Sequence, residues 1–188
     1  GAITSVVYDS LNRIKQVTDP LGYSTSYIYD KNNNVTSVTD REGKVSTYAY
    51  DSLNRIKSFT DNNNHTVTTT YDAIGNIIQL RDQNNNITNY TYDSLNRRKR
   101  MTYPDGKYQE FSYDNKSNII GNRLTDGTII TYQYDTLNRV KNKTLPNGEV
   151  FGYTYDDLGR IITATNSSGT ITIAYDALRK VDFEKIFY

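Results

Sequence analysis

The chain has 188 residues and a mass of 21.5 kDa, with 22 Lys and Arg against 21 Asp and Glu, so its formal net charge is +1. This balance argues against a nucleic-acid binder or a membrane-surface binder, which needs a net basic field. Cysteine is absent, which excludes disulfides, thiol catalysis and cysteine-based zinc sites. No apolar run is long enough for a membrane-spanning helix, so membrane insertion is not expected.

The dipeptide Tyr-Asp recurs in register along the chain. Its spacing is 21 residues seven times and then 20 residues. A fixed period of this kind is typical of a repeat protein. We therefore expect one repeat array over residues 1–176 and a non-repeat tail over residues 177–188, as a helix or a strand that caps the sheet edge. The nine repeat tyrosines are Tyr8, Tyr29, Tyr50, Tyr71, Tyr92, Tyr113, Tyr134, Tyr155 and Tyr175.

Each unit predicts two strands and two turns. An aromatic or β-branched residue usually stands two positions before the tyrosine, as Tyr48 does, which indicates a strand with its large side chains on one face. Four positions after the tyrosine stands Asn or Gly in most units, as at Asn54, and these residue types adopt positive φ in tight turns. A second strand, for example residues 55–60, leads to a second Gly or Asn turn.

The predicted fold is all-β, a curled strip of roughly 17 strands made of consecutive antiparallel β-hairpins, one for each 21-residue repeat. The alternative is a parallel β-solenoid with one coil per repeat. Hairpins are favoured because two turn signals alternate with two strand signals in each unit. A parallel coil would also need more continuous apolar runs.

The repeated residues are predicted to have structural roles. We expect the tyrosine ladder to fill the concave face of the sheet; the alternative is a ligand platform whose open rings stack on sugars. The Asp after each tyrosine is expected to accept backbone N–H groups in the turn, and the Arg after the turn to pair with an Asp or stack on a Tyr ring. The turn-fixing residues of this interpretation are Asp9, Asp51, Asp93, Asp135, Gly75 and Gly159.

No catalytic, metal or cofactor site is predicted. Residues 30–34 and 82–86 resemble the start of a calcium loop, but Val35 and Ile87 stand where such a loop needs Gly, and turn chemistry explains these segments better. The single histidine, His65, is expected on the surface or a sheet face. No candidate nucleophile has a supporting base.

A 42-residue period lies over the 21-residue one. Alternate units carry Arg-x-Lys after the first turn, and the units between them carry Ile or Thr at the lysine position. Duplication of a two-repeat block would produce this pattern. The physical alternative is that the basic strands face solvent while the Ile strands are covered by a neighbouring turn of the strip or by a partner. This alternative predicts that Lys57, Lys99 and Lys141 are more exposed to solvent than Ile78, Ile120 and Ile162.

The unit resembles the YD repeat of the RHS family. The motif Tyr-Asp-x-x-(Gly/Asn)-Arg-(Ile/Val) stands at residues 8–14, 50–56, 134–140 and 155–161, although Asn34, Asn76 and Asn118 replace the Arg in three units. The resemblance implies a long antiparallel strip that spirals into a hollow shell. In bacterial toxins of this family the shell encloses a C-terminal effector, and related shells occur in wall-associated proteins and teneurins. Some YD repeats are linked to carbohydrate binding.

Together with this resemblance, the repeat pattern predicts a non-enzymatic structural segment of an RHS-type shell; the resemblance implies a secreted or cell-surface bacterial protein that encloses or presents a toxin or adhesion domain. The alternative is a carbohydrate-binding adhesion module that uses exposed tyrosines. The expected partners are other copies of the chain, through open sheet edges or the concave face, and carbohydrate. No cofactor, nucleic acid or membrane insertion is expected.

Overall fold

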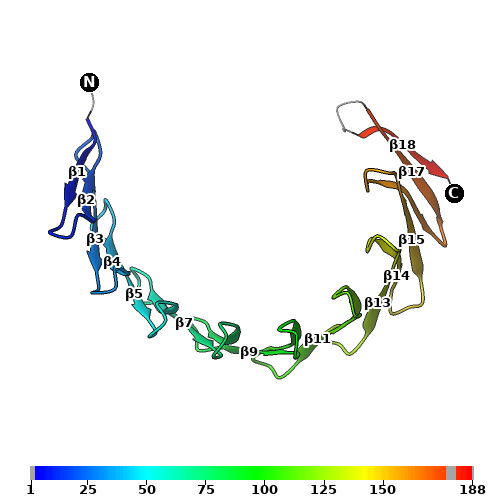
Figure 1. The fold of residues 1–188 in the computed structure, drawn as a ribbon, viewed down its shortest axis with the longest axis horizontal. Coiled ribbons are helices and arrows are strands. Elements are labelled where there is room, and N and C mark those ends of the chain that lie inside the picture. Colours follow the sequence, from blue (N-terminus) through cyan, green and yellow to red (C-terminus); the bar gives the residue numbers. More distant parts are fainter. Residues whose placement is uncertain (1–2, 177–180, 188) are drawn as a thin grey trace. The chain divides into compact units, whose positions relative to one another are not determined.

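The computed structural model describes residues 3–176 and 181–187, in which all regular structure is β-strand (Figure 1). These residues contain no helix that could span a membrane. Contacts divide the chain into two compact units, Gly1–Asn89 and Tyr90–Tyr188. The strands are β1 (Ser5–Tyr8), β2 (Ile14–Thr18), β3 (Ser24–Tyr29), β4 (Val35–Thr39), β5 (Val45–Tyr50), β6 (Ile56–Thr60), β7 (Thr66–Tyr71), β8 (Ile77–Arg81), β9 (Ile87–Tyr92), β10 (Arg98–Thr102), β11 (Tyr108–Tyr113), β12 (Ile119–Arg123), β13 (Ile129–Tyr134), β14 (Val140–Thr144), β15 (Val150–Tyr155), β16 (Ile161–Asn166), β17 (Gly169–Tyr175) and β18 (Val181–Phe187).

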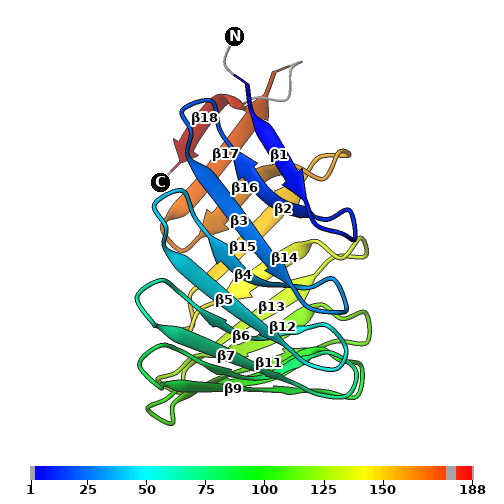
Figure 2. The same cartoon turned by 90° about the vertical axis from the view of Figure 1, so that its left-hand side faces the viewer.

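Strands that are neighbours in sequence are neighbours in the sheet. In the first unit β1 pairs with β2, β2 with β3 and so on, and in the second unit the same order runs from β10–β11 to β17–β18 (Figure 2). Every one of these pairings is antiparallel. The all-β fold of consecutive hairpins is therefore confirmed and the parallel solenoid is wrong. Curling of the whole strip stays a prediction.

Both turns of the repeat use the same short loop, except at residues 166–169, where Asn166 pairs directly with Gly169. In the first turn of one unit the Asp51 N–H donates to the Arg55 carbonyl oxygen at 2.9 Å, and the Asn54 N–H donates to the Asp51 carbonyl oxygen at 3.0 Å. Asn54 has a φ of 62°. This is a tight turn followed by a left-handed residue, the loop that joins two strands with one extra residue. The second turn repeats it, with Gly22 at a φ of 86°.

A β-bulge follows each first turn. Between β5 and β6 the register passes from Ala49 opposite Ser58 to Tyr50 opposite Ile56, so Lys57 is an extra residue in its strand. A bulge of this kind bends the strand and redirects a side chain. The same shift precedes the repeat tyrosine in the other described hairpins of this type, for example β3–β4 and β15–β16.

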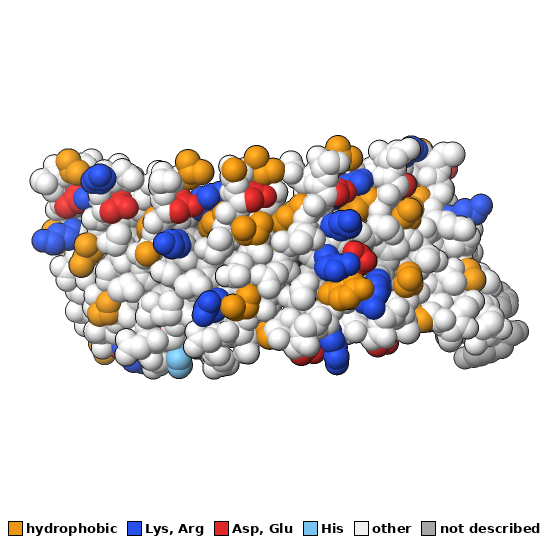
Figure 3. All heavy atoms as spheres, turned by 90° about the horizontal axis from the view of Figure 1, so that it is seen from below, with side chains coloured by type: hydrophobic (Ala, Val, Ile, Leu, Met, Phe, Trp, Pro, Cys, Tyr) orange, Lys and Arg blue, Asp and Glu red, His pale blue; other side chains and the backbone are white. Residues whose placement is uncertain are grey.

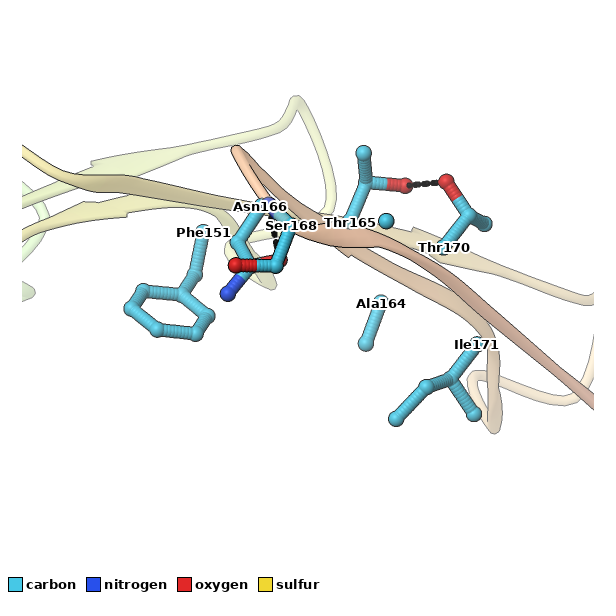
Figure 4. Close-up of a pocket in the computed structure, with 8 residues that line it drawn as sticks. Phe151, Ala164, Thr165, Asn166, Ser168, Thr170 and Ile171 are labelled. Carbon is cyan, nitrogen blue, oxygen red and sulfur yellow. Dashed lines mark hydrogen bonds between the residues drawn. The ribbon is translucent and has the colours of Figure 1, made fainter. Parts of the chain in front are cut away.

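The two faces of the sheet differ in chemistry. On one face, here called the tyrosine face, Tyr48 pairs across the strands with Phe59, with ring centroids 5.1 Å apart. On the other face hydroxyl groups pair, as in Thr60 and Thr66 at 2.8 Å. Figure 4 shows both faces in the second unit, where Phe151, Ala164 and Ile171 point to one side and Thr165 and Thr170 to the other.

Residues 3–176 have no hydrophobic core. No hydrophobic side chain among them is buried, and the repeat tyrosines are half-buried, except Tyr8, which is exposed. The tyrosine ladder that is expected to fill the concave face forms no buried core in this chain by itself. The physical reason is that a single layer of sheet has nothing packed against either face.

Part of the predicted non-repeat tail is a strand. Residues 181–187 form β18, which pairs with β17 in a register that places Phe183 opposite Ala174. The tail therefore extends the sheet by one strand rather than forming a helix there. Residues 177–180 and 188 lie outside the described residues.

Candidate functional site

The Tyr-Asp turn is the feature that the sequence repeats, and the aspartate organises it. The Asp51 Oδ1 atom accepts the backbone N–H groups of Leu53 at 2.9 Å and Arg55 at 3.1 Å. Its Oδ2 atom accepts the Arg55 Nε–H at 2.7 Å. Asp9, Asp93, Asp135 and Asp156 have the same three partners in their own turns.

These bonds lower the pKa of the aspartates. In Asp9 and Asp135 the backbone N–H of the motif arginine is the largest cause that holds the pKa of the carboxyl below its ordinary 3.8, and partial burial opposes it. Hydrogen bonds to the charged form of a carboxyl stabilise that form. The turn is therefore built around an ionised aspartate.

The motif arginine links one hairpin to the next. The Arg55 guanidinium pairs with Asp51 of its own turn, donates to the Asp72 carbonyl oxygen at 3.2 Å and lies 4.4 Å from the ring centroid of Tyr71. Asp72 and Tyr71 belong to the following repeat. Such a stack adds a cation–π attraction to the ion pair. The ring stack recurs in Arg13 over Tyr29, Arg97 over Tyr113, Arg139 over Tyr155 and Arg160 over Tyr175.

The tyrosine hydroxyl reaches back to the preceding repeat. The Tyr50 O–H donates to the Val35 carbonyl oxygen at 2.8 Å, and Val35 is the first residue of β4. Burial raises the pKa of Tyr50 above its ordinary 10.0. Each such tyrosine thus satisfies a main-chain acceptor 14 or 15 residues earlier. Tyrosines with this bond include Tyr29, Tyr50, Tyr71, Tyr113, Tyr134, Tyr155 and Tyr175.

Where asparagine replaces the motif arginine, the aspartate keeps its partner but the ring stack is lost. The Asn34 amide donates to Asp30 Oδ2 at 2.9 Å and to the Asn54 side-chain oxygen of the next repeat at 2.7 Å. Asn118 reaches Asn138 in the same way at 3.2 Å. The turn-fixing glycines Gly75 and Gly159 occupy the left-handed position, at φ values of 101° and 79°.

The two segments that resemble a calcium loop are turns. The Asp30 and Asp82 carboxylates each accept two backbone N–H groups and one asparagine amide from their own loop. His65 lies half exposed with its Nδ1 atom 3.1 Å from Asp61 Oδ2. In residues 3–176 no three His, Cys, Asp or Glu side chains gather where they could hold a metal.

Two equivalent grooves flank the bulged lysines. One has a volume of about 470 Å³ and the other of about 500 Å³, and their lining positions correspond at a spacing of 84 residues. Lys57 and Lys141 in these grooves are exposed and have no ion-pair partner within residues 3–176. The lining residues are Tyr50, Asp51, Ser52, Arg55, Lys57, Thr69, Thr70 and Tyr71, and Tyr134, Asp135, Thr136, Arg139, Lys141, Tyr153, Thr154 and Tyr155.

Within residues 3–176 no segment forms the expected cover over Ile78 or Ile120. Ile78 is 36% and Ile120 is 39% exposed, and both fall in the same exposed class as Lys57 and Lys99. The prediction that they are shielded is therefore wrong for these two residues, because the bulge turns this position outward in both kinds of unit. Ile162 is half-buried.

A hollow on the tyrosine face of the second unit was not predicted. It has a volume of about 290 Å³ and lies between Phe151 and Ile171, over Ala164 (Figure 4). Phe59 and Leu80 hold the corresponding position in the first unit, so the small Ala164 side chain opens the space. The signal in the sequence is this one small residue in a row of larger ones.

The chain is a β-repeat protein. Its hairpins share one structure, and a repeated tyrosine, aspartate and arginine connect each hairpin to the next. The family model of the RHS repeat matches residues 8–45, 29–66, 71–108 and 134–171, which together are more than half of the chain. The chain belongs to the RHS repeat family. A comparison with curated protein sequences found no match.

Solved structures show the same fold. The crystal structures of TcdB2-TccC3-TEV and of TcdB2-TccC3 without its hypervariable C-terminal region each align with 97% of this chain, at a TM-score of 0.78 and 14% identity. A mutant Tc holotoxin pore of Photorhabdus luminescens aligns with 98% of it, at a TM-score of 0.59 and 14% identity. This chain spans 11% of the first two chains and 14% of the third. At this identity the likeness concerns the fold alone.

Proposed function

We propose that this chain is a structural wall segment of an RHS-type shell, in a secreted or cell-surface bacterial protein. The observation that carries the proposal is the exposed area. The chain exposes 12794 Å², whereas a compact monomer of its mass exposes about 9,200 Å². A strip of sheet without a core fulfils a structural role when further surfaces cover its faces and edges.

The repeated side chains support this role over catalysis. The carboxylates of the Tyr-Asp turns accept hydrogen bonds from their own loops, and the motif arginines lie on tyrosine rings of the next repeat. Groups that are held in this way fix geometry between hairpins. We infer that this segment has no enzymatic activity of its own.

Membership of the RHS repeat family and the fold shared with Tc toxin proteins support a shell. Because the chain spans 11% to 14% of those chains, the role of a whole protein is a proposal here. We infer that in the parent protein the strip encloses or presents a toxin or adhesion domain.

The proposal predicts self-association of the chain, because other copies are the surfaces available to cover it in solution. Light scattering across a dilution series measures this directly. The expected result is a mass above 21.5 kDa that falls on dilution. A monomer at every concentration, with the fold intact by circular dichroism, would contradict the proposal.

Carbohydrate binding is a second candidate, favoured by the two grooves with lysine, hydroxyl and tyrosine side chains. Sugars bind through hydroxyl hydrogen bonds and aromatic faces, and a lysine suits an acidic sugar. The test is retention on immobilised polygalacturonate, with dextran as the neutral comparison. Lys57→Gln with Lys141→Gln should abolish retention, and the charge-matched pair Lys31→Gln with Lys116→Gln should not. An equal loss of retention in both pairs of variants would mean that binding depends on net charge and not on the grooves.

A further inference from the structure

Apolar side chains stand at the tips of the Tyr-Asp turns. The third residue of the turn is Leu or Ile in six described repeats, and each of these residues is between 61% and 68% exposed. We call this set the leucine row. In Figure 3 hydrophobic side chains line the upper edge of the molecule, above paired acidic and basic ones. The leucine row is Leu11, Leu53 and Ile74 in the first unit and Leu95, Leu137 and Leu158 in the second.

The turn itself does not need an apolar residue at its tip. The tip contributes only its backbone N–H, as Leu53 does to Asp51 Oδ1 at 2.9 Å. Asn32 and Lys116 occupy the same position in other repeats and donate the same bond at 2.8 Å. Each residue of the leucine row is more than half exposed, and Asn makes the same turn bond at the same position. The described hairpins therefore do not explain why the tip is apolar.

The opposite edge of the strip shows that the pattern is specific. Its turns have the same loop geometry except at residues 166–169, where Asn166 pairs directly with Gly169, and their tips are polar in all but one repeat. The exception is Leu21, whose N–H bonds to Asp19 Oδ1 at 2.8 Å. The polar tips are Glu42, Asn63, Asn84, Asp105, Asp126, Asn147 and Ser168.

The distance between successive tips of the leucine row indicates which partner fits it. Tips of successive hairpins are two strands apart, about 10 Å, and a partner that buries several of them needs apolar groups at the same interval. A second copy of the chain has apolar tips at this interval because it carries the same leucine row. The area that one copy exposes beyond a compact protein, on the order of 3,600 Å², is larger than the roughly 1,000–2,500 Å² that each partner buries in an obligate homodimer.

An anionic bilayer fits less well. At the same edge the Asp72 carboxylate has the neutral Asn76 amide as its side-chain partner and no ion pair within residues 3–176, so the charges beside the tips include a negative one. We propose that the leucine row is a seam that docks against the leucine row of a second copy. The inference deepens the proposed wall function and rests on it, since it names the surface through which the strip associates.

Sedimentation velocity over a dilution series tests the seam. Leu53→Asn introduces the residue that Asn32 already provides at an equivalent tip, so the hairpin should fold. Burial of one leucine is equivalent to roughly a tenfold change in binding, so the dissociation constant should rise about tenfold or more. Leu53→Asn combined with Leu137→Asn should weaken association further. The matched control is Leu21→Asn at the opposite edge, which should leave the dissociation constant unchanged.

The outcomes separate the seam from the wall function. If the unmodified chain associates and Leu53→Asn has no more effect than Leu21→Asn, the seam is wrong and the wall function stands. If the unmodified chain is a monomer at every concentration, the seam and the wall function are both wrong. If Leu53→Asn leaves association intact but abolishes sedimentation with phosphatidylserine vesicles, the row serves a lipid surface and the seam is overturned. Circular dichroism of each variant checks that the strip is folded.

Discussion

Replacement of Arg55 tests whether the arginine joins adjacent repeats. Arg55→Ala removes the paired bonds to Asp51, the bond to the Asp72 carbonyl and the stack on Tyr71. About three quarters of each side chain of the ion pair is shielded, so the pair contributes near the upper end for surface pairs, about 1 kcal/mol. The stack adds about 0.5–1 kcal/mol and the carbonyl bond about 0.5 kcal/mol. We expect a loss of about 2 kcal/mol in the free energy of unfolding.

Arg55→Asn separates these contributions, because the chain uses Asn at this position elsewhere. Asn34 keeps a 2.9 Å bond to the aspartate of its turn, so Arg55→Asn should retain the turn and lose the stack. The free energy of unfolding should then fall by about 1 kcal/mol. The assay is urea unfolding followed by circular dichroism, with hydrogen exchange of β6 and β7 amides as a local readout. The reasoning is refuted if Arg55→Asn destabilises as much as Arg55→Ala, or if neither changes stability.

Three further predictions concern the same repeat. Asn54→Ala should be about 1 kcal/mol less stable than Asn54→Gly, because both variants lose the bond from the Asn34 amide and only Ala keeps a β-carbon at the left-handed φ of 62°; calorimetry of both variants checks this. Tyr50→Phe should lose about 0.5–1.5 kcal/mol in urea unfolding, since the Val35 carbonyl loses its donor. The folded pKa of Asp135 is lowered, so its contribution is fully present well above pH 3.8 and is lost as pH falls through the folded pKa. Wild type and Asp135→Asn should therefore converge in stability in acid, and a difference that persists there would count against the ionised turn.

The hairpin architecture could be predicted from the sequence because its signals are local. The alternation around Tyr48 and the left-handed residue at Asn54 define a strand and a turn without reference to distant residues. The pairing of hairpins then follows from the short loops. The same local chemistry accounts for the turn role of Asp51.

Burial could not be predicted in the same way. A tyrosine at strand periodicity has the same sequence signal whether another layer covers it or solvent does, and in this chain the face around Tyr48 and Phe59 has no second layer. The outward position of Ile78 depends on a bulge, which a simple two-residue alternation does not reveal. The stack of Arg55 on the next repeat's Tyr71 joins residues 16 positions apart, and only the strand register brings them together.

The central claim is that this strip is a wall whose stability depends on the surfaces that cover it. The most direct measurement is the urea midpoint as a function of protein concentration. Association of the folded strip stabilises it by mass action, so the midpoint should rise as the concentration of the chain increases. A midpoint that stays constant over the whole concentration range would contradict the account.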